Sequence, residues 1–423
     1  MAIFTLAFTV RLVLVLVLHL PAHPEHAELE KIAASLAEAR SFANPYSLPT
    51  GPTAHHAPIY PFLLSLIYRL VGTGAGGSLG ECVFNITCVA LSFALLPIIS
   101  SAITAGPRIG TVAGALGALL PVCFMDEARG GYAPLVVIIL EGLFLLTLSA
   151  WRRRAFTARE AIGHGVLWGV ALLVSPSLLP VLLGFLLVAG VLLRRRPGRA
   201  IRFGALLATS ALVTMAPWGA RNVHELGALV LTRDNFGLEL QVSNNPLARP
   251  TLAENEASGA FHTYHPFANP AEARRVRALG EVRYDRAKLH TALDWIGGHP
   301  SAFARLTLRR AWEFWFPAAR SVPGTALPAT ALLWLVTVLG LAGLGALARR
   351  DGLSAALIAV IWAGYPLVYY VVQADARYRY PVYWSLLVVG AWWVGGVARA
   401  TASVQHVRWI RRNGRQKIAA REI

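Results

Sequence analysis

The sequence predicts an all-α integral membrane protein with about ten transmembrane helices. Long apolar runs recur along the 423 residues, of which 56% are hydrophobic and only 14% are charged. A soluble domain of ordinary composition carries about 25% charged residues. Clusters of arginine stand at the ends of several apolar runs. Because a backbone in lipid must satisfy its own hydrogen bonds, each long run is expected to be a helix.

The net charge of +17 follows the positive-inside bias of membrane proteins and does not indicate nucleic-acid binding. The arginines form short clusters at 151–154, 194–199 and 348–350, and a basic tail covers 399–423. Cytoplasmic loops are enriched in such residues, whereas a nucleic-acid-binding domain would carry a basic stripe with stacking aromatic residues. The three cysteines form no CxxC pair, so they indicate buried apolar positions and not a disulfide framework or a metal site.

Ten apolar runs give the predicted spans. The first run contains Arg11 and has no small-residue cleavage site, so it is expected to be a retained span and not a signal peptide. If this span leads outward, every strong arginine cluster falls on the inside. The expected spans are residues 3–20, 81–100, 110–124, 134–150, 161–174, 178–193, 203–219, 326–347, 353–372 and 382–398.

This topology divides the chain into four parts: an N-terminal transmembrane module, a large outer loop, the C-terminal transmembrane helices and a cytoplasmic tail, at 1–219, 220–325, 326–398 and 399–423. In the first outer loop, the apolar periodicity of 26–39 predicts a helix. The run at 59–72 is too short to span, so it is expected to be a helix in the outer interface. The large loop shows no clear core of its own, but the aromatic residues of 301–316 predict another interfacial helix.

Acidic side chains in the outer loops are candidates for acid–base chemistry. Glu25 and Glu28 stand on or before the first turn of the 26–39 helix, where the helix dipole alone can account for an acidic residue. Asp126 and Glu127 form an adjacent pair in the second outer loop. Such a pair can orient a hydroxyl group, bind a metal ion or remain a solvated charge.

Glu141 lies within an apolar run, where a carboxylate is by default functional or paired, and Arg11 is the candidate partner. His55 and His56 come just before the 59–72 helix. Adjacent histidines do not readily face one ion, so hydrogen bonding or an interface contact is favoured over a metal. No metal ligand is assigned.

The segment QADARYRYPVYW, residues 373–384, places two arginines in the last outer loop, against the positive-inside rule. In an extended segment Arg377 and Arg379 would point the same way, and two guanidinium groups suit a lipid phosphate. Tyr378 and Tyr380 add hydroxyl groups that tolerate the membrane interface. The competing interpretation is that the arginines snorkel and anchor a helix end.

In their order along the chain, these segments resemble the bacterial membrane glycosyltransferases of the dolichyl-phosphate-mannose–protein mannosyltransferase type, glycosyltransferase family 39, and their aminoarabinose-transferase relatives. These enzymes share the GT-C fold. The resemblance covers nearly the whole chain. It rests on EHAELEKIAASLAEARSF, GPTAHHAPIYPFLLSLIYRLVG, PWGARN, RDNFGLELQVSNN, GGHPSAFARLTLRRAWEFW and ARYRYPVYW.

The resemblance implies an inverting glycosyltransferase that moves a sugar from a polyprenyl-phosphate carrier to a hydroxyl acceptor on the outer face of a bacterial inner membrane. The first-loop acid would be the general base; the family usually has aspartate there, and Glu28 aligns with it, with Glu25 as the alternative. Asp126 resembles the second-loop acid of the fold. Where relatives have a lysine or another polar residue before the interfacial proline, this chain has His55 and His56. A divalent metal is variable in the group.

A membrane transporter or flippase of a lipid-linked or small anionic substrate is the main alternative. It predicts internal repeats and broken helices that meet at the bilayer midplane, and the sequence shows no clear repeat. A polysaccharide polymerase or ligase of the outer leaflet would share the lipid-phosphate chemistry. A non-catalytic membrane scaffold would give no reason for acids and arginines to gather in short outer loops.

Overall fold

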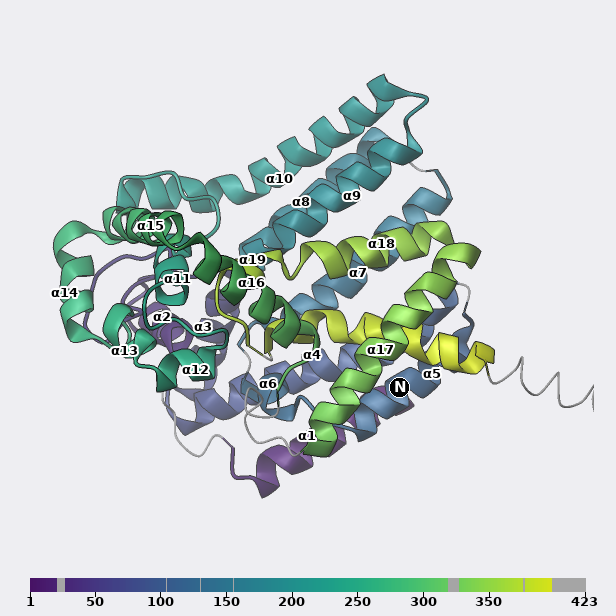
Figure 1. Cartoon of the computed structure of the whole chain (residues 1–423), viewed down its shortest axis with the longest axis horizontal. Helices are drawn as coiled ribbons and strands as arrows, with labels where there is room; N and C mark the ends of the chain where they lie inside the picture. Colours follow the sequence, from purple (N-terminus) through teal and green to yellow (C-terminus); the bar gives the residue numbers. More distant parts are fainter. Residues whose placement is uncertain are drawn as a thin grey trace, which may run out of the picture.

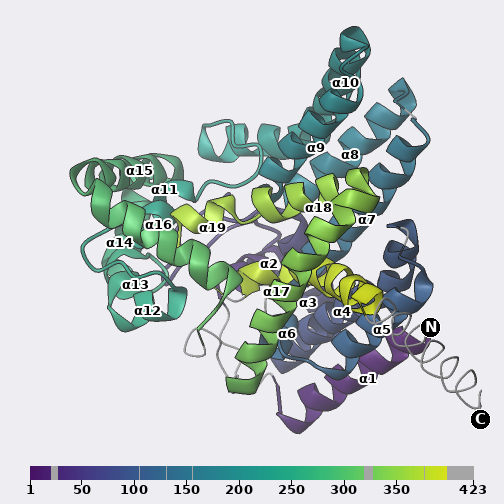
Figure 2. The same ribbon diagram turned by 45° about the vertical axis from the view of Figure 1, so that its right-hand side comes forward.

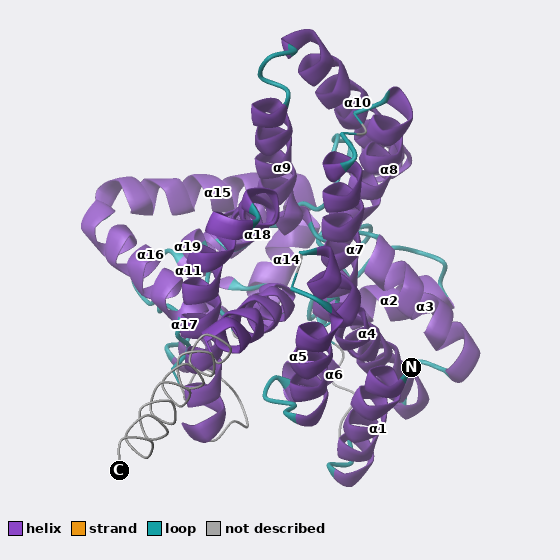
Figure 3. Ribbon diagram, turned by 90° about the vertical axis from the view of Figure 1, so that its right-hand side faces the viewer, coloured by secondary structure: helices purple, strands orange, loops and turns teal. Residues whose placement is uncertain are grey.

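The computed structural model describes residues 1–20, 27–103, 105–129, 131–154, 156–318, 327–375 and 377–397. This part of the chain is built from helices and contains no strand, as Figure 3 shows. Two isolated backbone bridges join Ala43 to Pro52 and Thr251 to Ala374. The predicted all-α class is therefore confirmed. The candidate acid Glu25 and the basic tail at 399–423 lie outside the described residues.

The N-terminal module follows the predicted order of helices. It contains the first-loop helix expected at 26–39, now α2, and the short helix expected at 59–72, now α3. Its helices are α1 (Ala2–Val17), α2 (Glu28–Glu38), α3 (Ile59–Val71), α4 (Ala75–Ala102), α5 (Pro107–Leu119), α6 (Phe124–Arg129), α7 (Ala133–Arg152), α8 (Ala158–Val174), the 3-10 helix η1 (Pro176–Leu178), α9 (Leu179–Leu192) and α10 (Pro197–Leu226).

The C-terminal helices are α17 (Leu327–Arg350), α18 (Gly352–Gly364), α19 (Leu367–Val371) and a last helix at 377–397. Within the described residues, five helices are long and apolar enough to cross a membrane: Ala75–Ala102, Ala133–Arg152, Pro197–Leu226, Pro328–Arg350 and Gly352–Val371. They support the predicted integral membrane protein. Every expected span coincides with a helix or a pair of helices, but ten crossings and their direction stay predictions.

The segment between the two groups of membrane helices is also helical. Its helices gather at one end of the molecule (Figures 1 and 2), and His265 of this segment contacts Glu28 of α2. They are α11 (Phe236–Ser243), α12 (Leu252–Ala257), α13 (Ala260–Tyr264), α14 (Pro270–Leu279), α15 (Glu281–Gly298) and α16 (Pro300–Trp315). The segment has a small core that it shares with the first loop, because Tyr46 belongs to it together with Leu238, Val242, Ala273, Val276 and Tyr284.

Helices α11 and α15 approach each other very closely at Gly237. A Cβ atom at this position would lie 2.1 Å from the carbonyl oxygen of Asp285, so no larger residue fits without a shift of the backbone. The carboxylate of Asp285 also accepts hydrogen bonds from the amides of Gly237 (3.1 Å) and Leu238 (2.8 Å), at the start of α11. These contacts fix α11, the helix that carries Glu239.

A buried ion pair connects α1 with α6. Nε and Nη2 of Arg11 donate to the two carboxylate oxygens of Glu127 at 2.7 and 3.0 Å, and Nη1 donates to the carbonyl oxygen of Ala118 at 3.0 Å. The predicted pairing of Arg11 with Glu141 is therefore wrong. Glu141 instead accepts a hydrogen bond from the Ser92 hydroxyl at 2.7 Å. Planar two-point contact between guanidinium and carboxylate favours the observed pairing.

Candidate functional site

A cavity of about 640 Å³ lies where α2 meets the helices of the middle segment (α11–α16) and the ends of η1, α9, α18 and α19. Its wall combines charged side chains with an apolar surface. The charged and polar part includes Glu28, Glu239 and His265, whereas Leu179 and Val368 belong to the apolar part. The cavity therefore offers both an ionic surface and a surface for an apolar group.

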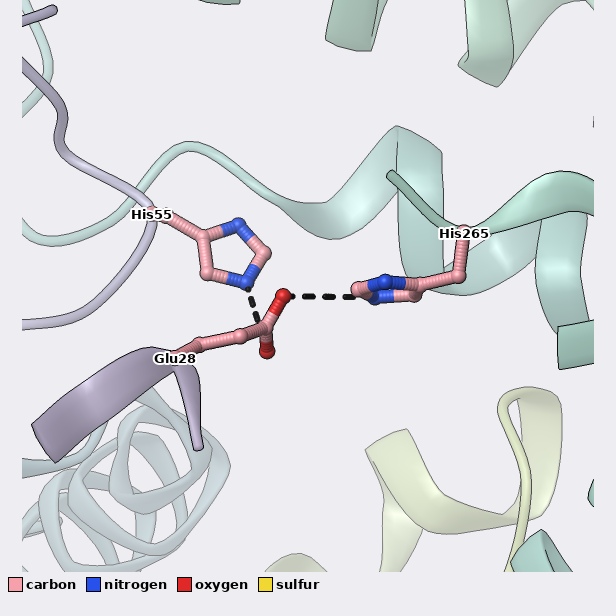
Figure 4. Close-up of side chains that lie close together, drawn as sticks. All are labelled: Glu28, His55 and His265. Atoms are coloured by element: carbon pink, nitrogen blue, oxygen red, sulfur yellow. Dashed lines mark ion pairs between the residues drawn. The ribbon is translucent and has the colours of Figure 1, made fainter. Parts of the chain in front are cut away.

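Glu28 stands at the first residue of α2 and is the centre of the polar wall. Its Oε2 lies 3.1 Å from Nε2 of His55 and 3.9 Å from Nε2 of His56. Its Oε1 lies 3.6 Å from Nε2 of His265 (Figure 4). Unsatisfied amides at the start of a helix also favour a negative charge there. Three imidazoles from two distant segments thus surround one carboxylate.

The loop that carries His55 is held by Glu281, the first residue of α15. The Thr53 hydroxyl and the Ala54 amide both donate to the Glu281 carboxylate, the latter at 2.6 Å. Arg221 of α10 donates to the carbonyl oxygen of Thr53 at 2.7 Å. The backbone just before His55 is thereby held by one helix of the middle segment, α15, and by α10.

His265 is held by its neighbours in the middle segment. Its ring stacks on Phe261, with centroids 4.5 Å apart and an interplanar angle of 18°. The Phe267 amide donates to its Nδ1 at 3.2 Å. Because a backbone amide only donates, a neutral His265 carries its proton on Nε2, the atom that faces Glu28 and, at 4.0 Å, Glu239.

The electrostatics of this cluster keep Glu28 ionised. Burial opposes its charge, but the attraction of His55 and His265 holds the pKa of the Glu28 carboxyl well below its usual range. Burial likewise opposes the His55 cation, yet the Glu28 charge raises the pKa of His55 to about 9. Burial lowers the pKa of His56 to about 4, and the charge of His55 adds to this effect. At neutral pH, Glu28 and His55 are charged and His56 is neutral.

Two arginines line the same cavity. Arg377 contacts Asp375, with Nε 3.7 Å from Oδ1, and its guanidinium lies 5.1 Å from the ring centroid of Tyr378. Arg233 lies in the segment before α11 and makes no hydrogen bond or ion pair with any described residue. Tyr378 also lines the cavity and stacks on Tyr369 at 4.2 Å. The cavity thus holds two guanidinium groups with unused donors.

Arg377 and Arg379 do not point the same way, as an extended segment would require. Both lie in the helix at 377–397, where a separation of two residues turns side chains by about 200°. Arg379 is buried and donates to the carbonyl oxygen of Leu333 and the hydroxyl of Thr337 on α17. Tyr380 is buried near the pair formed by Arg11 and Glu127.

The structure therefore brings some of the predicted site residues together and separates others. Those at the cavity or in direct contact with Glu28 are Glu28, His55, His56, Arg377 and Tyr378. Those outside it are Glu127, Arg379 and Tyr380. Asp126 belongs to α6, but its side chain lies outside the described part of the chain.

Sequence reasoning missed Arg233, Glu239 and His265. The first two belong to RDNFGLELQVSNN, a segment that carries the family resemblance but gives no predicted site residue. His265 follows His262 by three residues, but no spacing in the sequence connects it to His55. No model of a known protein family matches this chain, and a search of curated proteins found no relative.

Proposed function

We propose that this protein is an inverting glycosyltransferase of a bacterial inner membrane. It moves a sugar from a polyprenyl-phosphate carrier to a hydroxyl acceptor on the outer face. The observation that carries the proposal is the shared cavity, whose wall contains the Glu28 carboxylate, the guanidinium groups of Arg233 and Arg377, and the apolar residues Leu179 and Val368. Transfer from a lipid-linked sugar phosphate needs a base for the acceptor, positive charge for the phosphate and an apolar surface for the lipid.

In this reaction Glu28 is the general base. Its carboxylate takes the proton of the acceptor hydroxyl while the hydroxyl oxygen forms a bond to the anomeric carbon. The bond between that carbon and the phosphate oxygen breaks on the opposite face, so the configuration inverts. The electron pair of the broken bond leaves with the lipid phosphate. The His55 cation keeps Glu28 ionised before the substrate arrives.

Arg233 and Arg377 stabilise the departing phosphate. Negative charge grows on the phosphate as the bond to the sugar breaks, and fixed positive groups stabilise that charge without reorganising. Guanidinium groups offer paired donors that match phosphate oxygens. Arg233 suits this task because none of its donors is used by a described residue. The apolar part of the cavity would contact the first isoprene units of the carrier.

The test is lipid analysis of a strain that lacks the gene. If the protein uses a polyprenyl-phosphate sugar, deletion should cause that lipid to accumulate, and the wild-type gene should remove it. Glu28→Gln should fail to remove it although the protein reaches the membrane. Glu38→Gln is a matched control, because Glu38 is exposed at the far end of the same helix. Loss of transport of a substrate without any such lipid would instead support the transporter alternative.

A further inference from the structure

The cluster around Glu28 also has the composition of a metal-binding site. One carboxylate oxygen of Glu28 and one ring nitrogen each of His55 and His265 all lie within 4.8 Å of one another (Figure 4). Ligands bound to one zinc ion at about 2.1 Å lie roughly 3.4 Å apart in tetrahedral geometry. Oε2 of Glu28 lies 3.1 Å from Nε2 of His55 and Oε1 lies 3.6 Å from Nε2 of His265, so each carboxylate oxygen stands near that separation from one ring nitrogen.

Two atoms of this cluster are buried without a hydrogen-bond partner in the described part of the chain. They are Oε1 of Glu28 and Nε2 of His55, and the whole His55 side chain is 0% exposed. Buried polar atoms without partners are rare in folded proteins, and many of them face a bound ion or an ordered water. A single cation between these two atoms would satisfy both.

The ring of His55 is held by a contact to its second nitrogen, as the rings of metal-binding histidines are. The Tyr46 hydroxyl lies 2.9 Å from Nδ1 of His55, which directs Nε2 toward the cluster. Such contacts to the second ring nitrogen fix the orientation of a metal ligand. A further carboxylate is close by, since Oε1 of Glu239 lies 4.0 Å from Nε2 of His265. The open cavity would supply water for any remaining position.

We propose that Glu28, His55 and His265 bind a divalent transition-metal ion, with Glu239 as a fourth ligand. Binding releases to solvent the proton that His55 carries in the metal-free protein, and the ion takes over the role of the His55 cation beside Glu28. Two imidazoles with a carboxylate form the ligand set of several catalytic zinc sites. Imidazole nitrogen favours zinc and neighbouring transition metals, whereas magnesium and calcium prefer sites made of oxygen. Zinc is therefore the probe of choice, and magnesium is the contrasting ion.

His265 is the weakest of the three ligands. Its Nδ1 accepts a hydrogen bond from the Phe267 amide, so the proton of the neutral ring is on Nε2. Coordination through Nε2 moves that proton to Nδ1, where it meets the amide hydrogen, and the 3.2 Å contact must open. We therefore expect loss of His265 to weaken zinc binding less than loss of His55.

Metal binding does not rest on the proposed transfer reaction, but a catalytic use of the ion does. An ion at Glu28 would lie where the acceptor hydroxyl must approach its base. A metal-bound hydroxyl group loses its proton more easily than a free one. The ion would thus assist the same step that Glu28 performs, without changing which bonds form and break.

The test uses the full-length protein in detergent, purified through a tag that contains no histidine and treated with a chelator. Calorimetric titration with zinc should show about one ion per chain, and magnesium should not compete at equal concentration. We expect His55→Ala and Glu28→Gln to weaken zinc binding at least a hundredfold, and His265→Ala about tenfold. His262→Ala is the matched control, because His262 is exposed on α13, three residues before His265.

A second measurement separates lost ligands from lost folding. Cobalt added in place of zinc should give visible absorption bands of a low-symmetry site with nitrogen and oxygen ligands. Zinc should raise the melting temperature of the wild type but not of His55→Ala.

The proposal is overturned if the folded wild type binds no zinc, or if the His55→Ala variant binds zinc as tightly as the wild type. If zinc fails to bind but Glu28→Gln still causes the sugar lipid to accumulate, only the metal inference is lost. If zinc binds and no such lipid accumulates on deletion, only the transfer reaction is lost.

Discussion

The hydroxyl of Tyr46 lies 2.9 Å from Nδ1 of His55. Tyr46 belongs to the small core of the middle segment, and the other ring nitrogen of His55 faces Glu28 across 3.1 Å. The packing of the middle segment is therefore connected to the orientation of the candidate base through one histidine. This connection makes Tyr46 a positioning residue, which need not touch a substrate.

Tyr46→Phe should lower kcat of sugar transfer about fivefold, because one ordinary hydrogen bond contributes about 1 kcal/mol. KM for the lipid donor should change little, since the arginines that face the phosphate are untouched. The measurement is transfer by the reconstituted protein with saturating donor. Tyr284→Phe, which removes a hydroxyl bonded to Glu272 in the same small core, is the control for general loosening of the segment. Equal losses in both variants would contradict a specific role for Tyr46.

Glu127→Gln should destabilise the folded protein by about 3–5 kcal/mol, because it leaves the Arg11 guanidinium buried without its counter-ion. Arg11→Met should do the same, whereas the double variant should recover much of the loss. Thermal unfolding in detergent measures all three. A Glu127→Gln protein that melts like the wild type but binds its substrate poorly would instead restore the sequence-based role of Glu127 in substrate binding.

The helices of this protein could be predicted from the sequence because their signals are local. Apolar runs, arginine clusters and the periodicity of 26–39 are written in neighbouring residues, and the structure has helices at these places. Glu28 could be predicted because it stands at the start of a helix, in a polar segment that follows the first apolar run. His55 could also be predicted, since a pair of histidines beside an apolar run is conspicuous.

The rest of the site depends on contacts between distant parts of the chain. His265 meets Glu28 across more than two hundred residues of sequence. Arg11 of α1 pairs with Glu127 of α6 in place of Glu141, and no local pattern reveals either contact. The common direction expected for Arg377 and Arg379 requires an extended conformation. A helix that begins at 377 sends them in opposite directions.

Arg377 and Arg379 should therefore respond differently to replacement. Arg377→Gln should weaken binding of a lipid-linked sugar phosphate about tenfold or more, as expected for loss of a charged hydrogen bond, with an unchanged melting temperature. Arg379→Gln should lower the melting temperature, because Arg379 is buried and binds α17 through Leu333 and Thr337. Binding is measured with the detergent-solubilised protein. Identical effects of the two replacements on donor binding would contradict this assignment.

The folded protein should lose the stability that Glu281 contributes as the pH rises from about 4.5 to about 7. Burial raises the pKa of Glu281 to about 7, whereas the unfolded chain releases this proton near pH 4.5. Between these values the folded state holds a proton that the unfolded state has lost, so the contribution of Glu281 is full below pH 4.5 and disappears by pH 7. The free energy of unfolding should change by at most about 1.4 kcal/mol per pH unit because of Glu281.

The test compares the pH dependence of the melting temperature in the wild type and in Glu281→Gln. The glutamine cannot titrate, so the variant should lack the pH dependence due to Glu281, while its side chain keeps the shape that contacts Thr53 and Ala54. Parallel pH profiles of wild type and variant would show that Glu281 holds no proton in the folded state.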